Sequence, residues 1–429
     1  MFGFANFLLL ALFAAAVFDL IFALARGGGL RGALHGLWNT PHLLFGQQLA
    51  EWRLQLGRIL FAAGLAAYEI SVVFCNSMAR QNWAWVQGVM SPVLEWLAFL
   101  CFGAKILFGT RYTWRELLAG GALYFIARWV YFNSQNIWWI GIVVAVLAAK
   151  DVPLRHPLQV YFASGCAAMA VVLALHFAGI VAPDLTSERM GALRGTYGYG
   201  HPNTFGGLVF GLVLAYALLR AQKVRWVDCL LVFAVGVFLL VGPASRSAAL
   251  CTLALAVGLV FCRLRAGHSV PRWWPGTCAG MVGLTAAVSY LLPLLVIKVG
   301  PWNNDIGPAW LAKLDSLLTC RISLTWMAYR LLDVKIAGQV FNWPTVDNSF
   351  AFALFQFGPV VAALLGILFA AALWGHAKQG RRVEVCCLFA MLAYAYMEVQ
   401  PFHLTTNPTA LLLCGAVFAQ TSARWQKIE

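Results

Sequence analysis

Apolar stretches long enough to cross a lipid bilayer recur along the whole chain. The first, FANFLLLALFAAAVFDLIFAL, runs from Phe4 to Leu24 and contains a single acidic residue. A transmembrane helix needs about 20 consecutive apolar residues, whereas the strands of a membrane β-barrel alternate apolar and polar positions. Because these stretches are continuous, the sequence predicts an all-α polytopic integral membrane protein with about 12–13 transmembrane helices. No small-residue cleavage site follows the first stretch, so we expect it to remain as a span.

Composition agrees with a membrane-embedded chain. Of the 429 residues, 62% are apolar and 11% are charged, whereas a soluble domain carries about 25% charged residues. A soluble fold of this composition would expose large apolar patches. The sequence shows no internal repeat and no soluble domain, so we expect one polytopic domain over residues 1–429. The expected spans are 4–25, 58–75, 89–109, 116–132, 136–149, 158–182, 204–220, 226–242, 247–262, 276–296, 349–374, 383–400 and 408–421.

The basic residues gather in alternate loops. Of the 30 Lys and Arg residues, twenty lie in one set of loops, nine lie in the other, and Arg128 lies within a span. The positive-inside rule makes the richer set cytoplasmic, so the net charge of +14 indicates membrane topology and not a nucleic-acid partner. The C-terminus is then inside. The N-terminus is outside with thirteen spans and inside with twelve.

Two outer loops, 183–203 and 297–348, follow from this orientation. In the second, apolar residues recur at helical spacing over Ala309–Leu318 and Arg321–Val334. We expect these two helices to lie at the membrane surface or to cap a cavity.

The first outer loop ends in RGTYGYGHPNTFGG, Arg194–Gly207. Asn203 or Thr204 can cap a helix that begins near Phe205. The bare N–H groups of such a helix start favour an anion, and His201 suits proton exchange or a phosphate contact. The segment is therefore either a helix cap with a solvated histidine or the edge of an anion-binding site.

Two arginines on the outer side can likewise have either a structural role or a role in binding an anion. Arg246, in GPASRSAAL, lies between two apolar spans with no acid nearby in sequence. It must reach the interface, pair with an acid or hold an anionic ligand. Arg321 shares a helix with Trp326 and Arg330. Its guanidinium matches phosphate oxygens, but an interfacial anchoring helix has the same residues.

Polar residues also stand next to two late spans. Asp347 and Asn348 directly precede an apolar span, where Asp347 is either a helix cap or a carboxylate base. The segment EVQPFHLTTNPT places Glu398, His403 and Asn407 at a third outer corner. The outer acids are few, and the sequence contains no D-x-D, H-x-x-x-H or Walker motif, so we expect neither a metal nor a cofactor.

Taken together, these segments resemble the O-antigen polymerase and ligase superfamily. The resemblance rests on GHPNTFG at 200–206, SRS at 245–247, Arg321 through Trp326 to Gly338, and VDNSF…FG from Val346 to Gly358. In this chain the residue after Arg246 is Ser, where the family often has Gly. Ligases typically show a His where this chain has Asp347, so the chain is more similar to the polymerases of capsular or extracellular polysaccharide.

The resemblance implies a polymerase that joins undecaprenyl-diphosphate-linked repeat units at the outer face of a bacterial cytoplasmic membrane, with the catalytic role in loop 297–348. It implies a glycan donor and acceptor in the bilayer, and a flippase and chain-length regulator as partners. The expected catalytic residues are Arg246, Arg321 and Asp347, and the expected substrate-binding residues are His201, Asn203, Arg194, Arg330, Asn348 and His403.

Two alternatives stay open. A ligase would transfer finished polymer to another acceptor and would carry nearly the same residues. A transporter or flippase of lipid-linked sugars would instead place charges along a path within the spans, where Asp19, Glu69, Glu95 and Arg128 are the candidates. These four show no repeat between the halves of the chain, which favours the enzyme.

Overall fold

The computed structural model of the chain describes residues 2–25, 29–45, 50–181, 187–189, 192–296 and 308–418. Four predictions lie partly outside the described residues. They are the span 158–182 at residue 182, the first outer loop at 183–186 and 190–191, the second outer loop at 297–307, and the last span at 419–421.

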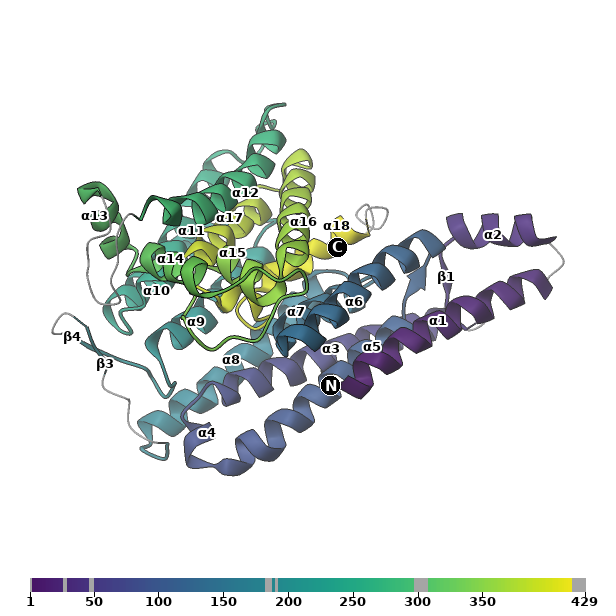
Figure 1. Cartoon of the computed structure of the whole chain (residues 1–429), viewed down its shortest axis with the longest axis horizontal. Coiled ribbons are helices and arrows are strands. Elements are labelled where there is room, and N and C mark those ends of the chain that lie inside the picture. Colours follow the sequence, from purple (N-terminus) through teal and green to yellow (C-terminus); the bar gives the residue numbers. More distant parts are fainter. Residues whose placement is uncertain are drawn as a thin grey trace. The chain divides into compact units, whose positions relative to one another are not determined.

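Most of the described chain is helical (Figure 1). The elements of the N-terminal half are α1 (Phe2–Ala25), α2 (Gly29–Asn39), β1 (His42–Leu43), α3 (Ala50–Cys75), α4 (Ala79–Asn82), the π-helix η1 (Val86–Met90), α5 (Ser91–Phe108), β2 (Arg111–Tyr112), α6 (Trp114–Ser134), α7 (Ile137–Ala148), α8 (Arg155–Phe177), β3 (Ser187–Arg189), β4 (Ala192–Arg194) and α9 (Pro202–Leu219). The strands form two short antiparallel pairs, β1 with β2 and β3 with β4.

The described residues of the C-terminal half form helices joined by loops, the longest of which spans residues 332–348. Its elements are α10 (Trp226–Val241), α11 (Arg246–Leu264), α12 (Trp274–Leu291), the 3₁₀ helix η2 (Leu292–Leu295), α13 (Ala309–Leu317), α14 (Arg321–Leu331), α15 (Ser349–Phe352), the π-helix η3 (Ala353–Phe357), α16 (Pro359–Lys378), α17 (Arg382–Met397), the 3₁₀ helices η4 (Gln400–Phe402) and η5 (Pro408–Leu413), and α18 (Cys414–Val417).

Eight helices in the described residues are long and apolar enough to cross a membrane, as an all-α polytopic protein requires. They account for eight of the thirteen predicted spans. Of the other five, α7, α10 and the segment 408–417 are apolar but shorter than 18 residues. Helix α6 is long enough but carries Arg115, Glu116 and Arg128, and α17 has 16 residues. A total of twelve or thirteen spans therefore stays a prediction.

The contacts within the chain divide it into two compact units. The first comprises residues 1–128, 140–208 and 410–429, and the second comprises residues 129–139 and 209–409. In the first unit, α3 lies side by side with α5 and α8. Phe61 of α3 packs on Phe102 of α5, with ring centres 5.5 Å apart, and all three helices contribute residues to the apolar core.

In the second unit, three pairs of helices pack together. These pairs are α10 with α11, α11 with α17, and α12 with α16. An aromatic cluster joins α15, η3 and η4. The ring of Phe402 lies 5.7 Å from that of Phe352 and 5.1 Å from that of Phe357. These contacts lie next to the C-terminal end of α17 and the N-terminal end of α15, which carry the candidate site.

The predicted span 349–374 is wrong as one continuous helix. It is broken at Gly358, between η3 and α16, where the backbone φ is 88°. The cause is a close crossing of two segments. A Cβ atom on Gly358 would lie 2.1 Å from the carbonyl oxygen of Ile336, and one on Gly338 would lie 2.0 Å from that of Gln356. Only glycine fits at either position. Gly338 and Gly358 each end one of the segments on which the family resemblance rests. Each of them lies against the backbone just before the other.

The two helices expected in the second outer loop are present as α13 and α14. Asp315, fully buried in α13, joins them. Its carboxylate accepts hydrogen bonds from the backbone N–H groups of Ile322 (2.7 Å) and Ser323 (3.2 Å), and from the Ser323 hydroxyl (2.8 Å). An acid at the start of a helix satisfies N–H groups that have no partner in the helix. The sharp connection between α13 and α14 places Arg321 at the first position of α14.

Candidate functional site

The C-terminal end of α17 is where several of the predicted site segments meet. The last carbonyl groups of a helix have no partner within it and carry a partial negative charge. Here Asn348 Nδ2 donates to the carbonyl oxygen of Tyr396 (3.1 Å), and Arg321 Nε donates to that of Met397 (2.7 Å). The end of α17 therefore draws together α14 and the segment before α15, which are distant in sequence.

Arg321 is the centre of this cluster. Its Nη2 lies 2.8 Å from Oε1 of Glu398 and 3.7 Å from Oδ2 of Asp347, while Nη1 donates to the carbonyl oxygen of Thr319 (3.2 Å). Only 7% of Arg321 is exposed. A buried guanidinium between two carboxylates is held in one orientation, since its donors form a rigid fork.

Glu398, the first residue after α17, is the second buried charge. Its Oε1 also accepts a hydrogen bond from Ser247 Oγ (2.8 Å), and its carbonyl oxygen accepts one from Ser349 Oγ (2.5 Å). Burial raises the pKa of the Glu398 carboxyl, Arg321 acts in the opposite direction, and Asp347 raises it further. Glu398 thus joins the start of α11 and the start of α15 to Arg321.

Asp347 and Asn348 have different roles, although they are adjacent. The helix cap is Asn348, whose Oδ1 accepts from the N–H groups of Phe350 (2.9 Å) and Ala351 (3.1 Å). Asn348 is buried, whereas the Asp347 side chain is 28% exposed. The capping interpretation of Asp347 is therefore wrong. Its carboxylate lies at the accessible edge of the cluster, beside Arg321.

Arg246 begins α11, one residue before the serine that contacts Glu398. It is exposed, whereas Ser245 and Ser247 on either side are buried. Ala244 has a φ of 49°, which turns the chain sharply into the helix. Among the three predicted catalytic residues, Arg321 and Asp347 are in direct contact, and Arg246 is linked to them through Ser247 and Glu398.

The remaining predicted residues of the second unit lie apart from the ion pair. Arg330 is exposed at the end of α14, with its guanidinium carbon 5.7 Å from the centre of the Trp326 ring. The ring of His403 lies on Trp138, with centres 4.0 Å apart, and burial lowers the pKa of His403 to about 4. His403 is therefore a neutral ring packed against an aromatic one.

The segment RGTYGYGHPNTFGG belongs to the first unit. The prediction that α9 begins near Phe205, with Asn203 or Thr204 as its cap, is wrong by three residues, because α9 begins at Pro202. His201 is the cap, and its Nδ1 accepts a hydrogen bond from the N–H group of Asn203 (3.1 Å). The proline lacks an N–H group and has a φ suited to the first helical position, which explains the earlier start.

Asn203 instead receives a hydrogen bond from Arg194, whose Nη2 donates to its Oδ1 (2.9 Å). Between them the chain makes a tight turn, in which Tyr199 N–H donates to the carbonyl oxygen of Thr196 (3.0 Å). Tyr197 and Gly198 both have positive φ, at 51° and 81°. The three predicted residues Arg194, His201 and Asn203 are thus brought together around the start of α9.

Sequence reasoning named Glu398 but gave it no role, and it missed Ser247 and Ser349. A signal existed, because a cation buried beside spans needs an acid partner, and Glu398 is one of few outer acids. Within the described residues, no group of three or more His, Cys, Asp or Glu side chains could hold a metal ion.

No protein-family model, no curated protein and no solved structure matches this chain.

Proposed function

We propose that the protein is a polysaccharide polymerase of the outer face of a bacterial cytoplasmic membrane. It would join undecaprenyl-diphosphate-linked oligosaccharide units by metal-independent glycosyl transfer. The observation that carries this proposal is the contact of Arg321 with both Asp347 and Glu398, together with the position of Arg246 next to Ser247. A buried cation that holds an accessible carboxylate, with an exposed cation at the start of α11, suits a reaction that releases a diphosphate.

The proposed reaction is a displacement at the anomeric carbon of the growing chain. A hydroxyl oxygen of the acceptor unit forms the new bond to that carbon, and the bond to the diphosphate oxygen breaks. The electron pair of the broken bond leaves with the lipid diphosphate. The hydroxyl proton passes to a carboxylate, and Asp347 is the candidate because its side chain is partly exposed.

The two arginines have distinct roles in this proposal. Arg246 is exposed, so it can reach the diphosphate and stabilise the charge that develops on it. Arg321 is buried, so it acts mainly by holding Asp347 and Glu398 and by adding positive potential to the site. His201, Asn203, Arg194, Arg330, Asn348 and His403 remain proposed substrate-binding or supporting residues.

The first experiment is an in-vitro assay with purified protein and lipid-linked repeat units. We expect products that lengthen by whole repeats in the absence of any second acceptor, and we expect Arg246→Ala to reduce this activity at least 100-fold. If the protein transfers preformed polymer to a second acceptor and makes no longer chains by itself, it is a ligase. If lipid-linked sugar crosses the bilayer of a vesicle without any new glycosidic bond, the enzyme proposal fails.

Asp347→Asn tests the carboxylate. We expect kcat to fall by about 10²–10⁴-fold, the usual contribution of a general base, with little change in KM. Asp333→Asn is the matched control, because Asp333 is an exposed acid that follows α14 in the same segment. Wild-type kcat in Asp347→Asn, or an equal loss in Asp333→Asn, would remove Asp347 from the mechanism.

A further inference from the structure

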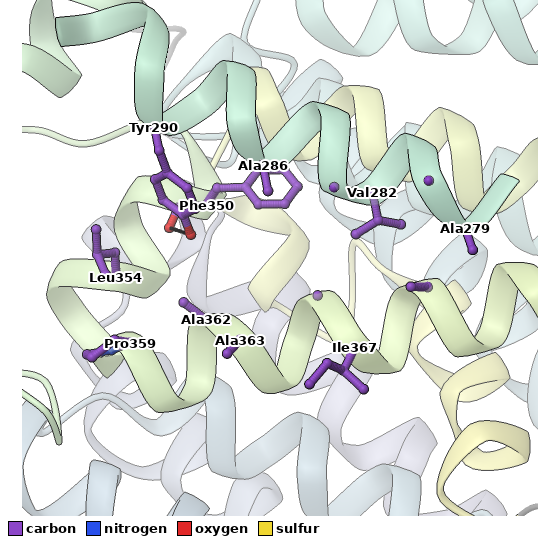
Figure 2. Close-up of a pocket in the computed structure, with 14 residues that line it drawn as sticks. Ala279, Val282, Ala286, Tyr290, Phe350, Leu354, Pro359, Ala362, Ala363 and Ile367 are labelled. Carbon is purple, nitrogen blue, oxygen red and sulfur yellow. Dashed lines mark hydrogen bonds between the residues drawn. The ribbon is translucent and has the colours of Figure 1, made fainter. Parts of the chain in front are cut away.

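A narrow apolar groove runs between α12 and α16, within the second unit (Figure 2). Its volume is about 600 Å³, which is in the range of small-molecule sites. Eight of the fourteen described residues that line it are Ala or Gly, and the rest are also uncharged. The groove is therefore suited to a hydrocarbon and not to a sugar or a phosphate.

The glycines of the groove have no packing role inside this chain. A Cβ atom built on Gly280, Gly283 or Gly366 would meet no described atom within 4 Å. Glycine in a helix costs about 1 kcal/mol relative to alanine. Small residues at such positions keep space open for something that approaches the helices.

The length of the groove suits an extended hydrocarbon chain. Along α12 the groove extends from Ala279 to Tyr290, which is about 17 Å at 1.5 Å per residue. An extended hydrocarbon segment can lie along this length between the two helices.

One end of the groove adjoins the candidate site. Tyr290 Oη donates to the carbonyl oxygen of Phe350 (3.2 Å), and both residues line this end. Figure 2 shows the two rings together there. The residue before Tyr290 is Ser289, whose hydroxyl accepts from Asn348 Nδ2 (3.1 Å). Phe350, at this end of the groove, follows Asp347 by three residues in sequence, and Asp347 contacts Arg321.

We propose that this groove is the subsite for the isoprenoid chain of the lipid-linked substrate. The chain would lie along Gly280, Gly283 and Gly366, and its diphosphate would be presented to the exposed Arg246. This inference rests on the proposed function, but binding of the chain needs no catalysis and can be tested without it.

The test is photolabelling of the full-length protein in phosphatidylcholine nanodiscs. The probe is a long-chain isoprenyl phosphate that carries a diazirine on its hydrocarbon part. We expect saturable labelling of peptides from α12 and α16, and at least a 5-fold loss of labelling in Gly366→Leu, which fills the groove. Gly375→Leu is the matched control. Gly375 is also in α16 with no atom within 4 Å of an added Cβ, but it does not line the groove.

Several outcomes would overturn the proposal. One is equal labelling of Gly366→Leu and Gly375→Leu, and another is labelling confined to other helices. A third is equal, unsaturable labelling by a phosphatidylcholine that carries the diazirine on its acyl chain, which would mean that the groove takes any bilayer lipid. A change of oligomeric state in Gly366→Leu with unchanged labelling would assign the groove to a second copy.

The same variants separate this inference from the proposed function. If the groove is labelled as expected but purified protein makes no glycosidic bond, the function fails and the subsite stands. If the protein polymerises and Gly366→Leu has the wild-type KM and labelling, the function stands and the subsite fails. The expected result is a KM raised about 10-fold in Gly366→Leu and unchanged in Gly375→Leu.

Discussion

Two arginines in this protein are buried to the same degree and are held in different ways. Arg194 in the first unit and Arg321 in the second are each 7% exposed. Arg194 donates to the amide oxygen of Asn203, nine residues along the chain, whereas Arg321 donates to the carboxylate of Glu398, 77 residues away. The first contact orders a local turn and helix start. The second ties together segments that are distant in sequence.

The difference concerns what each arginine does for the fold. A hydrogen bond from a charged donor to a neutral amide contributes about 1.5–3 kcal/mol. A buried ion pair costs more to break, about 3–5 kcal/mol, because the remaining charge is left in an apolar environment. The pair of Arg321 and Glu398 should therefore respond to substitution differently from the pair of Arg194 and Asn203.

The largest expected effect is that of Arg321→Met. This change keeps the apolar stem but leaves Glu398 buried without its cation, so we expect a loss of about 3–5 kcal/mol in unfolding free energy. It should also abolish polymerisation. Adding Glu398→Gln should restore most of the stability, since a neutral amide needs no cation, but it should not restore activity. Thermal unfolding in detergent and the elongation assay measure the two separately.

Arg194→Met is the matched comparison. We expect it to cost about 1.5–3 kcal/mol, and Asn203→Asp should not compensate for it. If Arg194→Met and Arg321→Met lose the same unfolding free energy, the charge of the partner does not decide how much each arginine stabilises the fold. If the double variant of Arg321 and Glu398 is no more stable than Arg321→Met, the ion pair is not the source of the loss.

Much of the fold could be predicted from the sequence, wherever local signals decide the structure. The helical class of the chain followed from continuous apolar stretches, because the helix period and the bilayer thickness leave few alternatives. Helices α13 and α14 followed from their apolar spacing. Local signals also located the starts of α9 and α15 to within a few residues, since capping depends on neighbours in sequence.

The errors arose where distant segments decide the outcome. The break at Gly358 depends on the backbone of Ile336, and no pattern around Gly358 contains that information. The choice between Asp347 and Asn348 as the cap depends on Ser289, Tyr396 and Arg321. Glu398 could be named from the sequence, but its pairing with Arg321 needs the fold of the second unit.

A smaller effect is expected from His403, which is mostly buried, and the smallest from His201, which is exposed. Burial lowers the pKa of His403 to about 4 from 6.5, so the folded state favours its neutral form. Stability is then fully present above pH 6.5 and is lost as the pH falls towards 4, because the unfolded chain binds the proton first. The loss is at most about 3 kcal/mol, at 1.36 kcal/mol per pKa unit.

His403→Phe isolates this contribution, because a phenyl ring can keep the stack on Trp138. We expect the melting temperature of the wild type to fall more steeply between pH 6.5 and 4.5 than that of His403→Phe. Glu398 titrates in both proteins, and its raised pKa acts in the opposite direction, so only the difference between the two slopes is informative. Parallel slopes would mean that folding does not change the pKa of His403.

The smallest effect is expected at His201, which is exposed and caps α9. His201→Ala should cost about 0.5–1 kcal/mol, the usual value of a lost cap. His201→Asn should recover that stability, because an asparagine side chain accepts the same hydrogen bond. If the segment also contacts an anionic substrate, as proposed, His201→Asn should keep a KM several-fold above that of the wild type. Wild-type KM in His201→Asn would limit His201 to capping, and the proposed substrate contacts would then lie with Arg246 and the residues around Arg321.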